Sequence, residues 1–196
     1  MATDRRLGRG QGDPETVFLD ANVLYSACCR DLLIEASLAG LCACRWSVGV
    51  LAEVRQALRR ARPDLPESAL QRTFNLLSVA CPDALSVSRS GRLPIRAALP
   101  DPADHHVIAA AYASGASTLL TFNLRHFPLR SLRGLPLTAQ TPDDWFVRLA
   151  MNRPDELVAL VERCRRRLQR PPLTRARHLE AMRASGLPHL AAHLDS

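Results

Sequence analysis

The chain has 196 residues, of which 47% are hydrophobic and 23% charged, and this balance excludes a wholly disordered or fibrous protein. No apolar run approaches the roughly 18 residues of a membrane-spanning helix, and the first residues lack the apolar stretch of a secretory signal, so we expect a cytoplasmic protein. The net charge is +7 and every basic residue is arginine, which suits a polyanionic partner because the guanidinium group binds phosphate oxygens in pairs.

Predicted strands and helices alternate along most of the chain. Residues 1–15 show no apolar periodicity and are expected to form a loose, flexible leader. Strands are predicted at 16–20, 42–46, 84–88, 117–122 and 135–139, and helices at 23–39, 48–61, 66–79 and 103–114. Strands that alternate with helices of about 10 to 15 residues indicate a parallel α/β sheet with helices on both faces.

The composition changes after about residue 142. Between Arg148 and Arg183 there are ten arginines and four acidic residues, so this segment carries nearly the whole positive excess. Two or three short helices are predicted here, with breaks at 171–172 and 186–188, where prolines interrupt the pattern. The predicted organisation is a leader (1–15), an α/β domain (16–142) and a helical C-terminal extension (143–196).

Four polar side chains are predicted to gather at the carboxyl ends of the strands, where ligands of open parallel sheets bind. Asp20 ends the first strand, although it also suits the N-cap of the next helix. Glu53 borders the apolar face of its helix, from which it reaches either a groove or solvent. Asp104 falls on the apolar face of a later helix, although it also completes a capping arrangement there. Asn123 follows the fourth strand.

Acidic side chains collected in this way repel one another unless a divalent cation neutralises them. Oxygen ligands suit Mg²⁺ or Mn²⁺, which also bind substrate phosphates. We therefore expect Asp20, Glu53 and Asp104, assisted by Asn123, to bind Mg²⁺ (or Mn²⁺). An acidic pocket in a basic protein is then compatible with a polyanionic substrate, because the ion bridges to one phosphate while arginines bind the rest of the polyanion.

Four segments carry a resemblance to a known family: FLDANVLYSA (18–27), WSVGVLAEV (46–54), PDPADHHVIAAAYASGASTLLTFNLRHFP (100–128) and RPPLTRARHLEAMRASGL (170–187). Together they resemble the PIN-domain family, and in particular the VapC-like toxins of bacterial toxin–antitoxin pairs that carry a helical C-terminal extension. The likeness spans about residues 16–195. By motif, Asp20, Glu53 and Asp104 match the metal-binding acids of the family, and Asn123 matches a fourth position that is often Asp.

The resemblance implies a fold, an activity and partners. The fold would be a three-layer α/β/α domain around a parallel sheet with strand order 3-2-1-4-5. The activity would be that of a metal-dependent endoribonuclease that hydrolyses RNA phosphodiesters with a metal-activated water and leaves 5′-phosphate and 3′-hydroxyl ends. The partners would be RNA, a cognate antitoxin protein and often a second copy of the chain, with no membrane involved.

The chain departs from the family pattern at two histidines. His126 stands where many relatives have an acid, and His105 stands where an arginine is common, so the number of bound metal ions stays open. His126 either hydrogen-bonds substrate or takes the place of the acid, whereas His105 and His106 lie off the apolar helix face and are expected to be solvated. The remaining candidates for supporting positions around the metal are Asn22, Asp101 and Thr121, and Asp101 is first of all a helix cap.

Arginines of the extension are candidates for contacts with the RNA backbone, and a solvated helix face is the alternative. The candidates are Arg163, Arg166, Arg167 and Arg170. Two other functions stay open at this point. One is a PIN scaffold with weak catalysis that binds RNA or a partner protein, which the missing acid at His126 favours. The other is a nuclease that acts on branched DNA with the same motifs.

Overall fold

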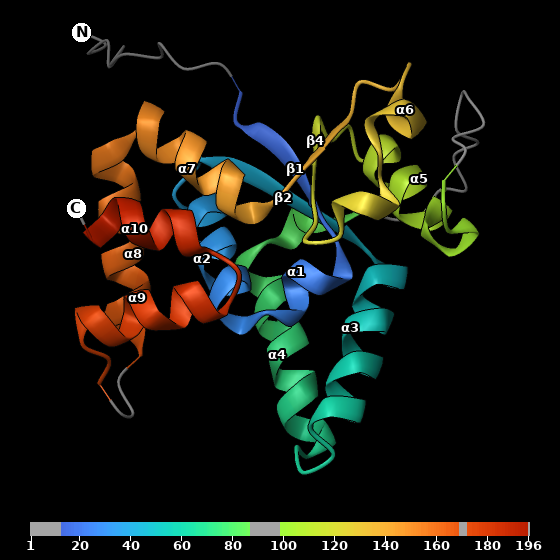
Figure 1. Ribbon diagram of the computed structural model, residues 1–196. Coiled ribbons are helices and arrows are strands. Elements are labelled where there is room, and N and C mark those ends of the chain that lie inside the picture. The colour runs from blue at the N-terminus through green and yellow to red at the C-terminus, as the bar shows by residue number, and fades with distance from the viewer. Residues whose placement is uncertain (1–12, 87–98, 169–171, 196) are drawn as a thin grey trace, which may run out of the picture.

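The computed structural model describes residues 13–86, 99–168 and 172–195, and it contains a five-stranded parallel sheet (Figure 1). The strands are β1 (Glu15–Leu19), β2 (Cys42–Ser47), β3 (Leu85–Ser86), β4 (Thr118–Leu120) and β5 (Thr138–Gln140). Their order is β3-β2-β1-β4-β5 and neighbouring strands are parallel. The predicted fold class and the strand order that the resemblance implied are therefore confirmed, although β4 and β5 are shorter than expected. The strand predicted at 84–88 extends beyond the described residues.

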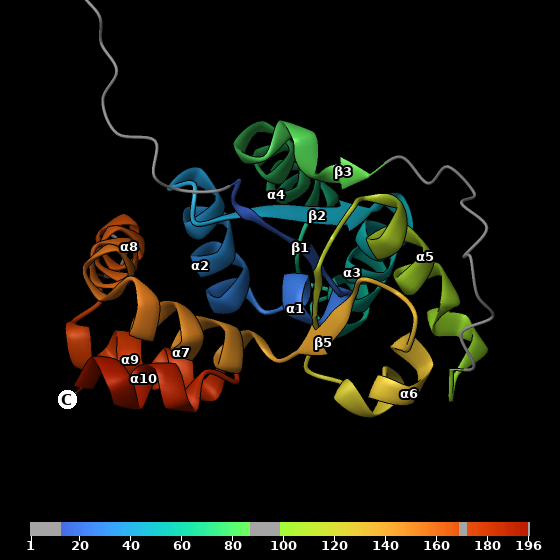
Figure 2. The same cartoon turned by 90° about the horizontal axis from the view of Figure 1, so that it is seen from above.

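Helices connect the strands and form the C-terminal region. They are α1 (Ala21–Tyr25), α2 (Ala27–Leu38), α3 (Val48–Ala61), α4 (Glu67–Ala80), α5 (His105–Ala113), α6 (Leu129–Leu132), α7 (Pro142–Asn152), α8 (Pro154–Arg167), α9 (Arg175–Ala184) and α10 (Pro188–Asp195). The described residues also include the 3₁₀ turns η1 (Pro82–Ala84), η2 (Pro102–Asp104) and η3 (Leu124–His126). Figure 2 shows α2 and the C-terminal helices on one side of the sheet and α5 and α6 on the opposite side.

The helix α3 matches its predicted bounds because the signals at both ends are local. The Ser47 hydroxyl accepts a hydrogen bond from the Val50 amide at 3.2 Å, which satisfies one of the free amides of the first turn. At the other end, Pro63 disfavours helical backbone at Arg62, where the helix stops. The second α-helix also ends as predicted, because Gly40 adopts a φ of 71° just beyond it.

The helix predicted at 23–39 is in fact two helices, α1 and α2, separated at Ser26. Ser26 has extended backbone with φ −69° and ψ 107°, and the Arg30 guanidinium donates to the Leu24 carbonyl at 3.0 Å across the break. That contact supplies a partner for a carbonyl at the end of α1. The described part of the C-terminal region contains four helices where two or three were expected, because Arg153 is not helical and separates α7 from α8.

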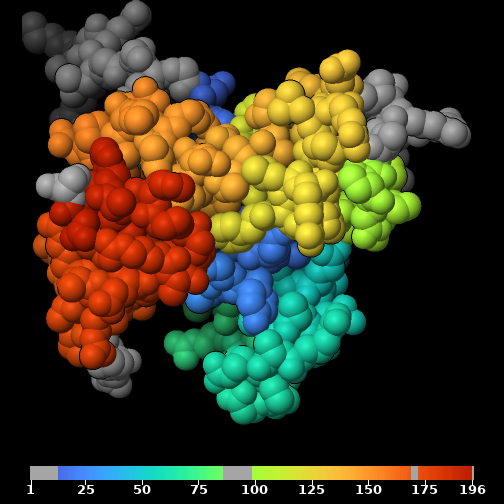
Figure 3. All heavy atoms as spheres, viewed as in Figure 1, coloured from blue at the N-terminus to red at the C-terminus, as the bar shows by residue number. Residues whose placement is uncertain are grey.

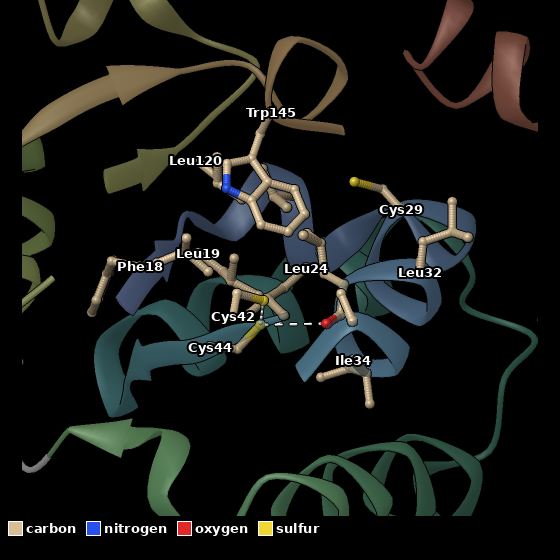
Figure 4. Packing of buried hydrophobic residues seen from close by; sticks show 14 of the residues in the cluster. Phe18, Leu19, Leu24, Cys29, Leu32, Ile34, Cys42, Cys44, Leu120 and Trp145 are labelled. Atoms are coloured by element: carbon tan, nitrogen blue, oxygen red, sulfur yellow. Dashed lines mark hydrogen bonds between the residues drawn. The ribbon is translucent and has the colours of Figure 1, made fainter. Parts of the chain in front are cut away.

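Apolar side chains of β1, β2, β4 and α2 form the core, which Trp145 of α7 joins (Figure 4). The cysteines are all free, and five of the six are buried, as expected for small apolar residues. Cys42 and Cys44 place their sulfur atoms 3.8 Å apart on one face of β2, where the Cys44 thiol also donates to the Leu33 carbonyl at 3.5 Å. These thiols belong to the packed interior.

Polar contacts attach the C-terminal helices to the sheet. Glu15 of β1 accepts hydrogen bonds from the Trp145 indole at 3.2 Å, the Arg148 guanidinium at 3.0 Å and the Thr118 hydroxyl at 2.5 Å.

An apolar cavity of about 520 Å³ lies between α2, α4, α8 and α9, where the face drawn in Figure 3 is hollowed between the C-terminal helices and α4. Among the described residues, no helix is long and apolar enough to cross a membrane.

Candidate metal centre

Asp20 is the most buried acid of the predicted site, with 7% of its surface exposed. Its Oδ1 atom accepts the Ala21 amide at 2.7 Å, so Asp20 caps α1, and its Oδ2 atom accepts Asn22 Nδ2 and the Thr121 hydroxyl, both at 2.7 Å. Burial raises the pKa of Asp20, and the negative charge of Asp104 acts in the same direction. The capping role and the site role therefore coexist in one carboxylate.

Asn22 and Thr121 hold Asp20 in place between two neighbouring strands. Asn22 Oδ1 accepts the Phe122 amide at 3.1 Å, and Asn22 Nδ2 also lies 3.1 Å from the Thr121 hydroxyl oxygen. Because β1 and β4 are adjacent and parallel, their carboxyl ends meet, and this network closes between them. Both residues were predicted as supporting positions, and both contact Asp20 directly.

Asp104 lies at the start of α5 rather than within it. The Asp101 carboxylate accepts the Ala103 amide at 2.8 Å and begins the 3₁₀ turn η2, which contains Pro102, so α5 starts only at His105. Asp104 was expected on the apolar helix face, but its side chain is 22% exposed and partly reaches solvent. Its Oδ2 atom lies 2.8 Å from Nδ1 of His126.

Glu53 extends from α3 toward the start of α5. Its Oε1 atom lies 2.8 Å from Nε2 of His106, with the two side chains 45% and 41% exposed. Partial burial raises the pKa of Glu53, His106 lowers it, and the charges of Asp20 and Asp104 raise it further. All three acids are therefore close enough to influence one another. His106 was expected to be solvated, and it is an exposed residue, although its ring also contacts Glu53.

The side chain of Asn123 contacts an arginine rather than one of the three acids. Its Oδ1 atom accepts Arg125 Nε at 3.0 Å, and among the described residues no other hydrogen bond of its side chain is recorded. Its backbone amide donates to the Thr121 hydroxyl at 3.0 Å, which places the residue beside the site. Arg125 was not predicted, since an exposed arginine in a turn carries no distinguishing sequence signal.

One group of donor atoms among the described residues could hold a divalent cation, and of the three predicted acids it contains Asp104 but not Asp20 or Glu53. One donor atom each from Asp101, Asp104 and His126 can be chosen so that all three lie within 4.8 Å of one another. The side-chain partners of Asp20, Glu53 and Asp104 are a hydroxyl, an amide and two imidazoles, rather than arginines. Burial raises the pKa of Asp20 and of Glu53 and the charge of Asp104 adds to this, and acids with such neighbours form a favourable environment for a metal ion.

The arginines proposed for RNA contacts bind acids of the chain itself. Arg163 and Arg167 both form ion pairs of 2.6 Å with the buried Glu35 of α2, which attaches α8 to the sheet domain. Arg166 forms a 2.8 Å ion pair with Glu162 in its own helix. Arg170 lies outside the described residues.

Two family models match the chain. A model described as "PIN domain" matches residues 16–125, and one described as "VapC50 C-terminal domain" matches residues 142–196. The first match contains Asp20, Glu53, Asp104 and Asn123, and the second contains the helices α7 to α10. No curated protein and no solved structure matches the chain.

Proposed function

The chain belongs to the PIN-domain family and has a VapC-type C-terminal region, and from this premise we propose that it is a metal-dependent endoribonuclease, the toxin of a type II toxin–antitoxin pair. The observation that supports this most directly is the approach of Glu53 of α3 and Asp104 of η2 to Asp20 at the end of β1: burial raises the pKa of Asp20 and of Glu53, and the charge of Asp104 raises both further. PIN domains are generally nucleases that use divalent metals, and the VapC-type match favours RNA as the substrate.

Asp20, Glu53 and Asp104 would hold Mg²⁺ or Mn²⁺, with Asn123 assisting from the edge of the site. When bound, the ion would lower the pKa of a coordinated water and stabilise negative charge on the phosphodiester. Asn22 and Thr121 fix the orientation of Asp20 by their hydrogen bonds to its Oδ2 atom. Such fixed ligands reduce the reorganisation that binding requires.

Arginine side chains would bind the rest of the RNA backbone. Arg125 is exposed and hydrogen-bonded to Asn123, so it can contact a phosphate next to the scissile one. Arg163, Arg166 and Arg167 can reach RNA only with the guanidinium atoms that their ion pairs leave exposed. We also propose the division of the chain near residue 142 into a nuclease domain and an extension, an antitoxin as the partner, and a homodimer as the assembly.

A PIN scaffold with weak catalysis, which binds RNA or a partner protein, is the second candidate. The observation that favours it is the contact of His126 with Asp104 where relatives have an acid, because this contact engages one oxygen of a predicted metal ligand. The two candidate functions differ in whether bound RNA is cleaved, rather than in whether RNA is bound.

RNA cleavage by the purified protein tests the proposal. Wild-type protein is expected to cut a structured RNA pool with Mn²⁺ or Mg²⁺ but not with EDTA, and to leave 5′-phosphate ends that a ligase accepts. The matched control is Asp20→Asn, which should bind the same RNA without cutting it. If the wild type and Asp20→Asn show the same residual cleavage, the nuclease proposal is wrong and the binding scaffold is supported. Expression of wild type and Asp104→Ala in a bacterial host is the cellular counterpart, since only the wild type should arrest growth.

A further inference from the structure

The turn between α9 and α10 lies against the segment that follows β4. Gly186 in this turn has a φ of 84°, and a Cβ atom on it would lie 2.8 Å from Cε1 and 3.2 Å from Cζ of Phe122. In Figure 3 the red C-terminal surface meets the yellow segment after β4. A ring can approach the backbone this closely only at a residue without a side chain. The C-terminal region therefore packs directly on the PIN domain, beside the candidate site.

The turn itself is held by hydrogen bonds and burial. The Gly186 amide donates to the Arg183 carbonyl at 3.2 Å. The Leu187 amide donates to the Met182 carbonyl at 3.0 Å, so the end of α9 is closed by two hydrogen bonds. The side chains of Leu187 and Met182 are both fully buried. Because interiors are close-packed, the turn cannot move away from Phe122 without disrupting this packing.

Phe122 is connected to Asp20 through its backbone. The Phe122 amide donates to Asn22 Oδ1 at 3.1 Å, and Asn22 Nδ2 donates to Asp20 Oδ2 at 2.7 Å. The Phe122 ring is half-buried against the apolar core, so a push on the ring also displaces the backbone of the same residue. A short path of contacts thus joins the C-terminal region to the most buried acid of the site.

We propose that Gly186 and Phe122 are positioning residues of the candidate metal centre: the turn between α9 and α10 fixes Phe122, and Phe122 fixes Asp20 through Asn22. Groups that orient a metal ligand from behind influence the site nearly as strongly as the ligand does. The C-terminal region thereby determines how Asp20 is held, although the three predicted acids all belong to the PIN domain. The inference rests on the proposed function because it concerns the same site, but the contacts can be measured without metal or RNA.

Amide hydrogen exchange of the full-length protein in EDTA, followed by NMR, tests this path of contacts. Gly186→Ala should raise the exchange rate of the Phe122 amide at least about tenfold relative to the amides of β2, which report changes in global stability. The matched control is Gly115→Ala. Gly115 also has a left-handed φ, of 70°, but a Cβ atom there would have no described atom beyond its chain neighbours within 4 Å. In this control the Phe122 amide should stay within about twofold of wild type.

Phe122→Leu provides the rescue, because leucine is smaller than phenylalanine and leaves room for a methyl group at position 186. In the Phe122→Leu background, Gly186→Ala should change exchange at position 122 by no more than about threefold. Melting temperatures verify that each variant is folded. If Gly186→Ala and Gly115→Ala affect the Phe122 amide equally, or if the effect of Gly186→Ala is as large in the Phe122→Leu background, the inference is wrong.

RNA cleavage, measured separately, distinguishes this inference from the proposed function. If wild type cleaves RNA, Gly186→Ala should lower kcat by about 10-fold and leave KM within about twofold, because the orientation of Asp20 changes and RNA binding does not. Equal kcat values in wild type and Gly186→Ala would contradict the positioning role. If wild type does not cleave RNA but exchange responds as expected, the path of contacts is supported and the nuclease is contradicted.

Discussion

Asp20 and Asp143 are both buried acids of this protein, but their surroundings differ. At the ends of β1 and β4, Asp20 is 7% exposed and its neighbours include two further acids, Glu53 and Asp104. Under the C-terminal helices, Asp143 is 5% exposed and accepts the amides of His189 and Leu190 at 3.0 and 2.9 Å, so it caps α10. Acidic side chains gather around Asp20, whereas both carboxylate oxygens of Asp143 accept hydrogen bonds from backbone amides.

The difference separates acids that serve the fold from acids that are available for a ligand. Hydrogen bonds from Thr118, Arg148 and Trp145 lower the pKa of Glu15, which joins β1 to α7, although partial burial opposes them. Burial and a neighbouring acid have the opposite effect on Asp20. A buried acid with a raised pKa and acidic neighbours is a better indicator of a functional site than burial alone.

The largest expected effect comes from the same substitution made in both regions. Asp20→Asn should reduce RNA cleavage by at least about 100-fold, because loss of a group that merely supports a metal ligand already costs about 10-fold to 100-fold. Asp143→Asn should leave cleavage by the folded protein within about twofold of wild type. Single-turnover cleavage rates of the two variants measure these effects, under conditions in which both variants are folded to the same extent. Equal losses in the two variants would contradict the distinction.

The effect on stability should be the reverse of the effect on RNA cleavage: substitution of Asp143 should destabilise the protein more than substitution of Asp20. Asp143→Ala leaves the first amides of α10 without their buried acceptor, and should lower the free energy of unfolding by about 2 to 3 kcal/mol. Asp20→Asn should lower it by less, about 1 kcal/mol in EDTA. An amide oxygen can still accept the Ala21 amide, whereas an amide nitrogen in the place of Oδ2 can no longer accept from Asn22, and loss of the buried charge offsets part of this cost. Urea unfolding followed by circular dichroism measures both values. A larger loss for Asp20→Asn would assign Asp20 to the fold.

A smaller effect is expected from the ion pairs that attach α8. Glu35 is buried, but Arg163 and Arg167 are 45% and 63% exposed, so water screens their attraction to it. A double-mutant cycle between Glu35→Gln and Arg163→Gln should give a coupling energy of about 1 kcal/mol. A coupling near zero would show that apolar packing alone holds α8 in place.

The pH dependence of stability should have opposite signs at Asp20 and Glu15. Asp20 has a raised pKa in the folded protein, so its contribution is fully present below about pH 4 and is lost as the pH rises through that raised pKa. Glu15 has a lowered pKa, so its contribution is present above about pH 4.5 and is lost as the pH falls through the lowered pKa.

Unfolding in EDTA between about pH 3 and pH 6 measures these slopes. Relative to wild type, Asp20→Asn should gain stability as the pH rises, and Glu15→Gln should lose it. If the free energy of unfolding changes with pH in the same direction in both variants, relative to wild type, the pKa values of Asp20 and Glu15 are not shifted in opposite directions.

Local signals in the sequence were sufficient for most of the fold. The Ser47 cap and the Pro63 stop bound α3, and Gly40 stops the chain beyond α2. The break at Ser26 could not be predicted in this way, because the Arg30 contact with the Leu24 carbonyl that accompanies it forms only in the folded chain.

For the candidate site, the sequence by itself determined that Asp20 and Thr121 lie at the carboxyl ends of strands of one parallel sheet, since strand alternation brings these ends to one edge. That their two strands are neighbours was implied by the family resemblance, and the pairing of β1 with β4 confirms it. Only the tertiary structure decided that His106 faces Glu53 and that Arg163 faces Glu35, residues that lie 53 and 128 positions apart. Helical periodicity specifies which face of a helix is apolar, but the angle at which two helices pack decides which polar side chains at their borders meet.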